Sequence, residues 1–166
     1  MAHFNIFFTG RDDALNCVMI GEDSSPRFFC FESQAPRTVL YSNNNTKVAS
    51  LHFGQGPQLG NATIGARTQP IRDLLAAGTS PNARSFYAAD GKRYEWRRIP
   101  NDPDAYDLYA LNPPVVRVAA FRRYQEQIPN LGQCHGLLQY TFNGSDLILY
   151  TLLTLALNRR VDAAAT

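Results

Sequence analysis

The chain has 166 residues, which is the length of about one domain and enough to bury a single substantial core. Hydrophobic residues make up 45% of the chain and charged residues 18%, a composition that excludes an intrinsically disordered protein. The formal net charge of +2 is too small to indicate nucleic-acid binding, and three cysteines are too few for a disulfide framework. We therefore predict one globular domain over residues 1–166.

Short apolar segments separated by Gly, Pro, Asn and Asp run through the first 142 residues. Many short strands at this spacing are typical of an antiparallel sandwich or barrel. A glycine-rich stretch at 54–60 has no helix after it, so we interpret it as a turn and not as a phosphate-binding loop. The predicted strands are roughly 3–8, 14–20, 27–33, 37–42, 46–53, 61–66, 84–89, 92–98, 106–111, 115–123 and 134–142.

Two of these strands are separated by Asp90-Gly91, the most specific local signal in the chain. Asp-Gly between two β-prone segments favours a two-residue hairpin turn in which both central residues have positive φ. We therefore predict a tight hairpin here.

Two segments do not follow the strand pattern, and the first covers residues 69–77. Pro70 lies near its start and Gly78 directly follows it, an arrangement that favours helices. We predict a short helix of about two turns.

The second exception, residues 145–158, is apolar on every face of a helix. Such a helix is either enclosed by its domain or spans a membrane, and spanning needs about 20 apolar residues whereas this segment has about a dozen. We predict a central core helix that buries Leu149, Leu152 and Leu153, with residues 161–166 as a tail and no transmembrane span. A short membrane anchor at the C-terminus is the alternative.

The hairpin F-Y-A-A-D-G-K-R-Y-E-W-R at 86–97 and the segment D-L-I-L-Y-T at 146–151 together resemble an uncharacterised domain family of basidiomycete fungi. Members of that family share an aromatic-rich DG-x-x-Y-x-W-[KR] hairpin and a C-terminal LDLI-x-x-T helix ending in basic residues. That family in turn is similar to the tubby-like superfamily, which includes LURP-one-related proteins and phospholipid scramblases.

The resemblance covers residues 3–160 and implies a closed antiparallel β-barrel of about 11–12 strands around a hydrophobic C-terminal helix. The chain departs from the family at residues 100–104 and at Pro113-Pro114, which look like insertions. It lacks equivalents of the tubby phosphoinositide site and of the scramblase calcium-binding segment. The resemblance therefore predicts the fold and leaves the activity open.

Charged and aromatic residues alternate in the strand at 92–98. Because successive strand residues point to opposite faces, we expect Tyr94 and Trp96 in the core and their charged neighbours outside. Basic residues are frequent in this strand and the next two, and they could form a patch for anionic lipid headgroups. The candidate lipid- or anion-binding residues are Lys92, Arg93, Arg97, Arg98, Arg117, Arg122 and Arg123.

Catalytic and metal-binding motifs are absent from the sequence. Cys134 and His135 are adjacent, so on a strand they face opposite sides and cannot share a metal ion. We expect a solvated acidic turn at 102–107, with weak divalent-cation binding as the alternative, and we predict no cofactor. An enzyme would have to use residues without motif support, for which the candidates are His52, His135, Tyr94 and Glu95.

The basic strands and the resemblance favour a non-enzymatic binding module, with anionic lipid headgroups at a membrane surface as its ligand. Two alternatives remain: a small cofactor-independent enzyme with a pocket at the barrel mouth, and a scaffold for a protein partner of unknown identity. The first ten residues lack the basic and apolar regions of a secretory signal, so we expect a cytoplasmic protein that can associate peripherally with a membrane. A nucleic-acid partner is not expected.

Overall fold

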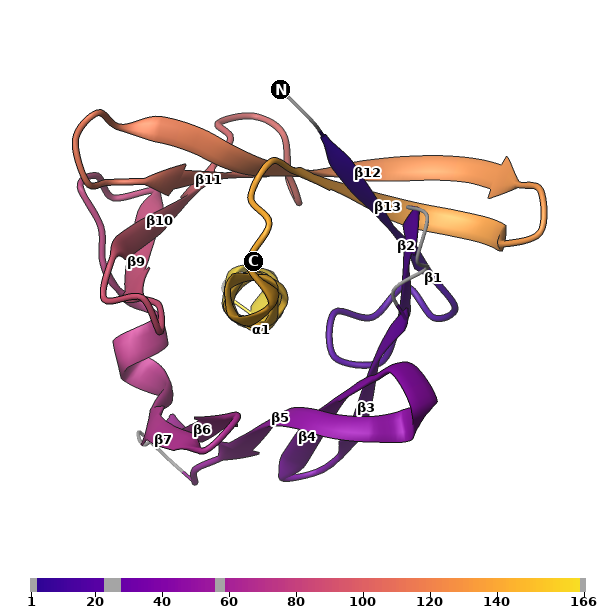
Figure 1. Cartoon of the computed structure of the whole chain (residues 1–166), viewed down its shortest axis with the longest axis horizontal. Helices are drawn as coiled ribbons and strands as arrows, with labels where there is room; N and C mark the ends of the chain where they lie inside the picture. The colour runs from indigo at the N-terminus through magenta and orange to yellow at the C-terminus, as the bar shows by residue number, and fades with distance from the viewer. Residues whose placement is uncertain (1–2, 23–27, 56–58, 165–166) are drawn as a thin grey trace.

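The computed structural model describes residues 3–22, 28–55 and 59–164 and consists of one antiparallel sheet curled around one helix (Figure 1). Residues 23–26, between the predicted strands 14–20 and 27–33, lie outside the described residues, as do residue 27 and residues 56–58 of the glycine-rich turn. The thirteen strands have the order β7-β6-β5-β4-β3-β2-β1-β13-β12-β11-β10-β9-β8. Apart from the neighbours β1 and β13, every adjacent pair in this order is also consecutive in the sequence.

The strand pattern of the sequence predicts eleven of these strands. They are β1 (Phe4–Thr9), β2 (Val18–Glu22), β3 (Phe28–Gln34), β4 (Arg37–Ser42), β5 (Thr46–Phe53), β6 (Gly60–Ile64), β9 (Ala83–Tyr87), β10 (Arg93–Arg98), β11 (Tyr106–Ala110), β12 (Val116–Ile128) and β13 (Gly132–Tyr140). A single 3-10 turn, η1 (Asn43–Asn45), joins β4 to β5.

The predicted helix at 69–77 is wrong. This segment contains the end of β7 (Arg67–Pro70), a four-residue 3-10 helix η2 (Ile71–Leu74) and the two-residue strand β8 (Ala76–Ala77). Ile71 and Leu74 are the buried residues of η2, and they pack into the common core. Ala76 and Ala77 then pair with Ser85 and Arg84 of β9, so the chain is extended after η2 and the longer helix does not form.

The prediction of a closed barrel is also wrong. The sheet has two edges, β7 and β8, and the described residues of these strands do not pair with each other. The 3-10 helix η2 lies between them and contacts β6, β7 and β9. Closure would need a continuous ladder, but β8 has only two residues and Pro70 at the end of β7 has no N–H to donate. Side-chain packing therefore bridges the edges where hydrogen bonds do not.

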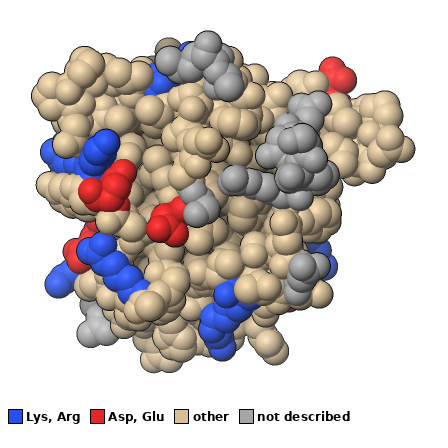
Figure 2. Space-filling view, in the orientation of Figure 1, with Lys and Arg blue, Asp and Glu red and all other residues tan. Residues whose placement is uncertain are grey.

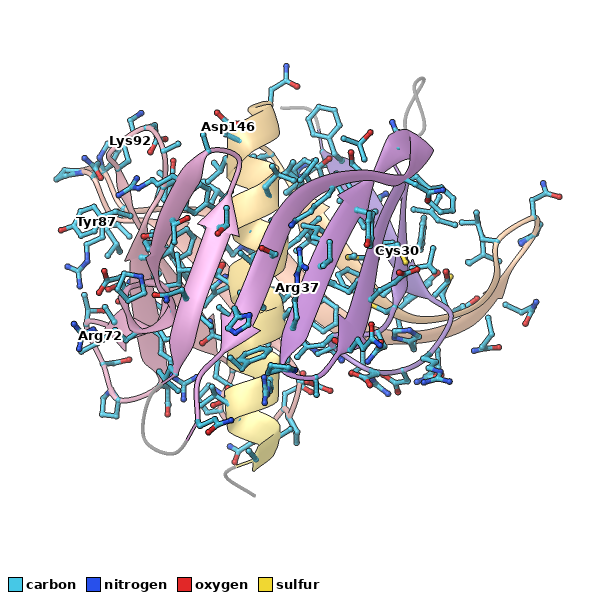
Figure 3. The ribbon with its side chains drawn as sticks, turned by 90° about the horizontal axis from the view of Figure 1, so that it is seen from below. Cys30, Arg37, Arg72, Tyr87, Lys92 and Asp146 are labelled. Atoms are coloured by element: carbon cyan, nitrogen blue, oxygen red, sulfur yellow. The ribbon has the colours of Figure 1, made fainter. Side chains whose placement is uncertain are left out.

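Helix α1 (Ser145–Ala164) runs along the axis of the curled sheet (Figures 1 and 3). Every residue from Tyr150 to Arg159 is buried, which is why its apolar residues follow no single stripe. The helix continues six residues beyond the predicted end at 158, so the predicted tail at 161–166 is wrong for residues 161–164. No helix in the described part of the chain is long and apolar enough to cross a membrane.

The core lies between α1 and the inner face of the sheet. Trp96 is 1% exposed and Tyr94 is 5% exposed, and both point inward from β10. Leu152 and Leu153 are buried in the middle of α1, whereas Leu149 is half-buried near its start. Phe86 from β9 lies parallel to the ring of Tyr150, with 6.3 Å between the ring centroids.

The hairpin between β9 and β10 forms, but its turn is longer than predicted. The amide of Gly91 donates to the carbonyl of Ala88, and the amide of Ala88 donates to the carbonyl of Lys92. Gly91 alone has positive φ (77°), so Asp90 does not adopt the predicted left-handed conformation. This is the three-residue loop with a glycine bulge. Asp90 is free to use its carboxylate as an acceptor for the hydroxyl of Tyr94 at 2.9 Å.

Candidate functional site

Asp162, in the last turns of α1, binds three side chains of the surrounding sheet. It accepts hydrogen bonds from Arg84 at 2.9 Å and from the hydroxyl of Tyr106 at 2.7 Å, and the Nε of Arg98 lies 3.9 Å away. Burial raises the pKa of the Tyr106 hydroxyl, and the bond to Asp162 raises it further. Arg98, a predicted lipid-binding residue, therefore belongs to an internal network.

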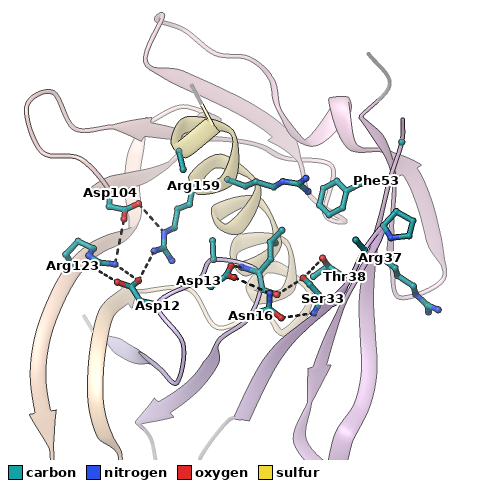
Figure 4. Close-up of a pocket in the computed structure, with 17 residues that line it drawn as sticks. Asp12, Asp13, Asn16, Ser33, Arg37, Thr38, Phe53, Asp104, Arg123 and Arg159 are labelled. Carbon is teal, nitrogen blue, oxygen red and sulfur yellow. Dashed lines mark hydrogen bonds and ion pairs between the residues drawn. The ribbon is translucent and has the colours of Figure 1, made fainter. Parts of the chain in front are cut away.

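A second network joins α1 to the loop between β1 and β2 (Figure 4). Both terminal nitrogens of Arg123 donate to the carboxylate of Asp12. The hydrogen bond from Arg123 is the main cause that lowers the pKa of Asp12 below its usual range. Arg159, only 6% exposed, donates to Asp104 at 3.3 Å and lies 4.7 Å from the ring centroid of Phe121. Arg123, another predicted lipid-binding residue, is therefore paired with the carboxylates of Asp12 and Asp104.

Glu95 lies on the outer face of β10, beneath the segment that follows β8. It accepts the amide of Thr79 at 2.6 Å, the hydroxyl of Thr79 at 2.8 Å and the Nε of Arg97 at 2.7 Å. Burial opposes ionisation of Glu95, but these three donors outweigh it and the pKa is lowered. Arg97 also stacks on Tyr109, with 3.9 Å from its guanidinium carbon to the ring centroid. These contacts leave Glu95 without an exposed oxygen for acid–base chemistry.

Asp107 on β11 engages two more of the predicted basic residues. Arg122 donates to it at 2.9 Å, and Arg117 lies 3.8 Å from its other oxygen. Arg93 donates to the carbonyl of Ala77 and to the hydroxyl of Ser85. Among the seven predicted residues, only Lys92 has an exposed side chain that forms no ion pair or hydrogen bond with another described residue. The structure therefore distributes the seven over separate locations.

The residues proposed for an enzyme are not close together. His52 is exposed on the outer face of β5, and the hydroxyl of Tyr94 is bound to Asp90. His135 is buried, with its Nε2 3.2 Å from the carbonyl oxygen of Thr9 and its Nδ1 3.4 Å from Asp12. No group of His, Cys, Asp and Glu that could hold a metal ion occurs in the described residues. Asp104 and Asp107 face arginines in different networks, which removes the basis for a cation site at 102–107.

Residues that sequence reasoning missed lie at the opposite end of the molecule, where α1 begins. The direction of the strands places them there: Arg84 of β9 contacts Asn158 near the end of α1, and Phe86 contacts Tyr150 near its start. Tyr87, the next residue, therefore lies beyond Phe86 at the helix start. Figure 3 shows Tyr87 and Lys92 on the side of Asp146, and Arg72 on the opposite side.

Large apolar side chains are exposed at this end. Val116 pairs with Ala110, which pairs with Tyr94, so Val116 and the preceding Val115 lie at the level of the β9–β10 hairpin. Phe28 lines a shallow depression together with Asp146 and Leu149. Their exposed fractions are 57% for Tyr87, 53% for Val115, 48% for Phe28 and 45% for Val116. The adjacent apolar pairs Phe28-Phe29 and Val115-Val116 could have indicated exposed apolar side chains, because successive strand residues point to opposite faces and only one of each pair can face the core.

Basic side chains accompany these apolar residues. Lys47 lies close to Phe28 in the fold, because Asn43 of the neighbouring η1 accepts the amide of Phe28. Arg67 lies at the same end, because the turn before it is bound through the amide of Gly65 to Val48, which lines the depression beside Asp146. We call the set at this end the helix-start rim. Its residues are Phe28, Lys47, Arg67, Tyr87, Lys92, Val115 and Val116, with the carboxylates of Asp90 and Asp146 among them. Figure 2, viewed from this end, shows few charged side chains on a broad uncharged surface.

Comparison with known proteins identifies a family without a known role. The model of a family of unknown function, DUF6593, matches residues 12–161. None of the curated proteins and none of the solved structures compared with the chain matches it.

Proposed function

Because the chain belongs to DUF6593, a family of unknown function, we propose its function from its geometry: a non-enzymatic binding module for anionic lipid headgroups at a membrane surface. The contact surface is the helix-start rim. The observation that carries the proposal is the joint exposure of large apolar and unpaired basic side chains at one end of the fold.

The apolar part of the rim supports insertion between lipid headgroups. Among the described residues, four of the five exposed large hydrophobic side chains belong to this rim, and only Leu59 lies elsewhere. Large apolar side chains that a fold exposes together at one end, among polar residues, are typical of an interaction site. Aromatic and valine side chains gain about 25 cal/mol for each Å² of apolar surface removed from water.

The basic part of the rim supports the choice of an anionic surface. Lys47, Arg67 and Lys92 are exposed, and none has a carboxylate within 4.0 Å in the described part of the chain. Each such cation contributes about 1 kcal/mol when it meets an anionic membrane. Asp90 opposes this attraction only in part, because it already accepts the Tyr94 hydroxyl and the Lys92 amide.

Most of the seven basic residues that the sequence predicted as lipid-binding do not support the proposal. Four of the seven donate hydrogen bonds to acceptors of the chain itself, and Arg98 and Arg117 form ion pairs with Asp162 and Asp107. Contact with lipid would have to compete with these interactions. Lys92 remains in the proposed surface. The enzyme alternative is not favoured by any observation, because its candidate residues lie in four separate environments. No observation favours the protein scaffold either.

Co-sedimentation with liposomes of phosphatidylcholine, with and without phosphatidylserine, tests the proposal. The double variant Lys47→Glu/Lys92→Glu changes two rim cations. The matched control Arg11→Glu/Arg72→Glu makes the same change in net charge with exposed residues at the other end of the fold. We expect wild type and control to sediment with the anionic liposomes at low salt, and the rim variant to stay in the supernatant.

A further variant tests the apolar contribution. Val115→Ser/Val116→Ser keeps all charges and removes exposed apolar surface. At physiological ionic strength, where charges are screened beyond about 8 Å, we expect this variant to bind anionic liposomes more weakly than wild type. If wild type does not sediment with phosphatidylserine liposomes at low salt, the proposal is wrong. Equal loss in the rim variant and the control would mean that net charge alone, and not the rim, governs binding.

A further inference from the structure

A cleft of about 850 Å³ opens at the opposite end of the fold, beside the last turns of α1 (Figure 4). Its walls come from α1, from the loop between β1 and β2, from β3, β4 and the end of β5, and from β12 and the loop between β10 and β11. This volume is within the range of small-molecule sites, which is about 300–1,000 Å³. The cleft is remote from the helix-start rim, so its role is independent of lipid binding.

The carboxylates in the wall of the cleft already have donors. Asp12 is held by Arg123, and Asp104 accepts a hydrogen bond from Arg159. Asp13 accepts the amide of Leu15 at 2.9 Å and the side-chain amide of Asn16 at 3.2 Å. Because these carboxylates are engaged, the cleft has little capacity left to recognise a cationic ligand.

Arg160 differs from the other cations of the cleft. Its guanidinium carbon lies 3.7 Å from the ring centroid of Phe53, and no carboxylate lies within 4.0 Å of it among the described residues. Arg37 also has no such partner, but its side chain points away from the cleft in Figure 4. Stacking on an aromatic ring orients the guanidinium plane while leaving its N–H donors free for a carboxylate or phosphate. Arg160 is therefore a preformed donor for an oxyanion.

Apolar groups complete the wall near this donor. Leu15, Ala35, Pro36 and Ala163 line the cleft together with Phe53. We infer that the cleft binds a small organic anion, with one phosphate or carboxylate group at Arg160 and an apolar body against these residues.

Isothermal titration with phenyl phosphate, benzoate and inorganic phosphate tests this inference. Phenyl phosphate and benzoate carry the two oxyanions on the same apolar ring, and inorganic phosphate lacks the ring. We expect a ring-bearing anion to bind more tightly than inorganic phosphate. A bond to a charged group accounts for about 10- to 100-fold in affinity, so Arg160→Gln should weaken binding by at least about tenfold.

Two controls separate this effect from damage to the fold. Arg72→Gln removes an exposed arginine outside the cleft and should leave binding unchanged, and Arg160→Lys should restore part of it. Ala14→Trp, at the wall of the cleft, should block binding by steric filling while Arg160 is intact. Absence of binding by both ring-bearing anions overturns the inference, as does binding that Arg160→Gln leaves unchanged. The Arg160 variants should bind anionic liposomes like wild type, so this test is independent of the lipid proposal.

Discussion

The indole N–H of Trp96 donates a hydrogen bond to the hydroxyl oxygen of Thr154 at 2.8 Å, which links the middle of β10 to the middle of α1. The Thr154 hydroxyl itself donates to the carbonyl of Tyr150 at 2.6 Å. Trp96 is 1% exposed and Thr154 is fully buried, so neither group can turn to water instead. This polar contact inside an apolar core fixes how α1 is rotated and placed within the sheet.

Thr154→Val removes this acceptor while keeping the shape of the side chain. The Trp96 N–H then stays buried without a partner, and we expect the free energy of unfolding to fall by about 1–3 kcal/mol. Urea denaturation monitored by tryptophan fluorescence measures the change. Thr151→Val is the matched control, because the Thr151 hydroxyl donates to the carbonyl of Leu147 in its own helix and to no strand among the described residues. Equal losses in the two variants would contradict the role given to Trp96.

Glu95 makes the stability of the fold depend on pH. Arg97 and Thr79 lower its pKa in the folded state below the ordinary value of 4.5, in spite of the opposing effect of burial. The folded state therefore binds the proton less readily than the unfolded chain. The stabilisation is fully present above the unfolded pKa and is lost as the pH falls through the folded pKa.

Glu95→Gln should remove this dependence. We expect the variant to be less stable than wild type by about 1–2 kcal/mol at pH 7, and the difference to shrink as the pH falls below 4.5. Urea denaturation at several pH values measures both quantities. Glu126→Gln, at an exposed position of β12, should leave the pH profile of wild type unchanged. A constant difference between wild type and Glu95→Gln over this range would contradict the prediction.

The three cysteines should differ in reactivity in the folded protein. Burial raises the pKa of the Cys17 thiol to about 12, and it also raises the pKa values of Cys30 and Cys134. Cys17 and Cys134 are buried, whereas Cys30 is half-buried. Because the thiolate is the reactive form and must be reached by the reagent, Ellman's reagent at pH 8 should modify Cys30 first. Cys30→Ser should remove the fast phase, and a fast phase that survives this substitution would contradict the assignment.

The sequence predicted much of the local structure. Turn residues and alternating apolar positions located eleven strands, and the all-round apolar segment located the central helix, because these patterns follow directly from strand and helix geometry. The end of the helix was predicted too early, because basic residues such as Arg159 and Arg160 are favoured in the last turn of a helix. In the structure Arg159 forms an ion pair with Asp104 and Arg160 stacks on Phe53, and the helix continues beyond both residues.

The tertiary structure decided which charges face solvent and which are paired. Alternation placed Glu95 and Arg97 together on the outer face of one strand, but it could not show that Thr79 binds Glu95 or that Asp107 lies beside Arg122. It also could not bring Asp12 to Arg123, which is 111 residues away. These two residues meet because β13 pairs with both β1 and β12, which brings the end of β1 close to β12. The curling of the sheet around α1 gathers Tyr87, Val115 and Phe28 at one end of the helix, and no local pattern records that proximity because it depends on the register of strands far apart in the chain.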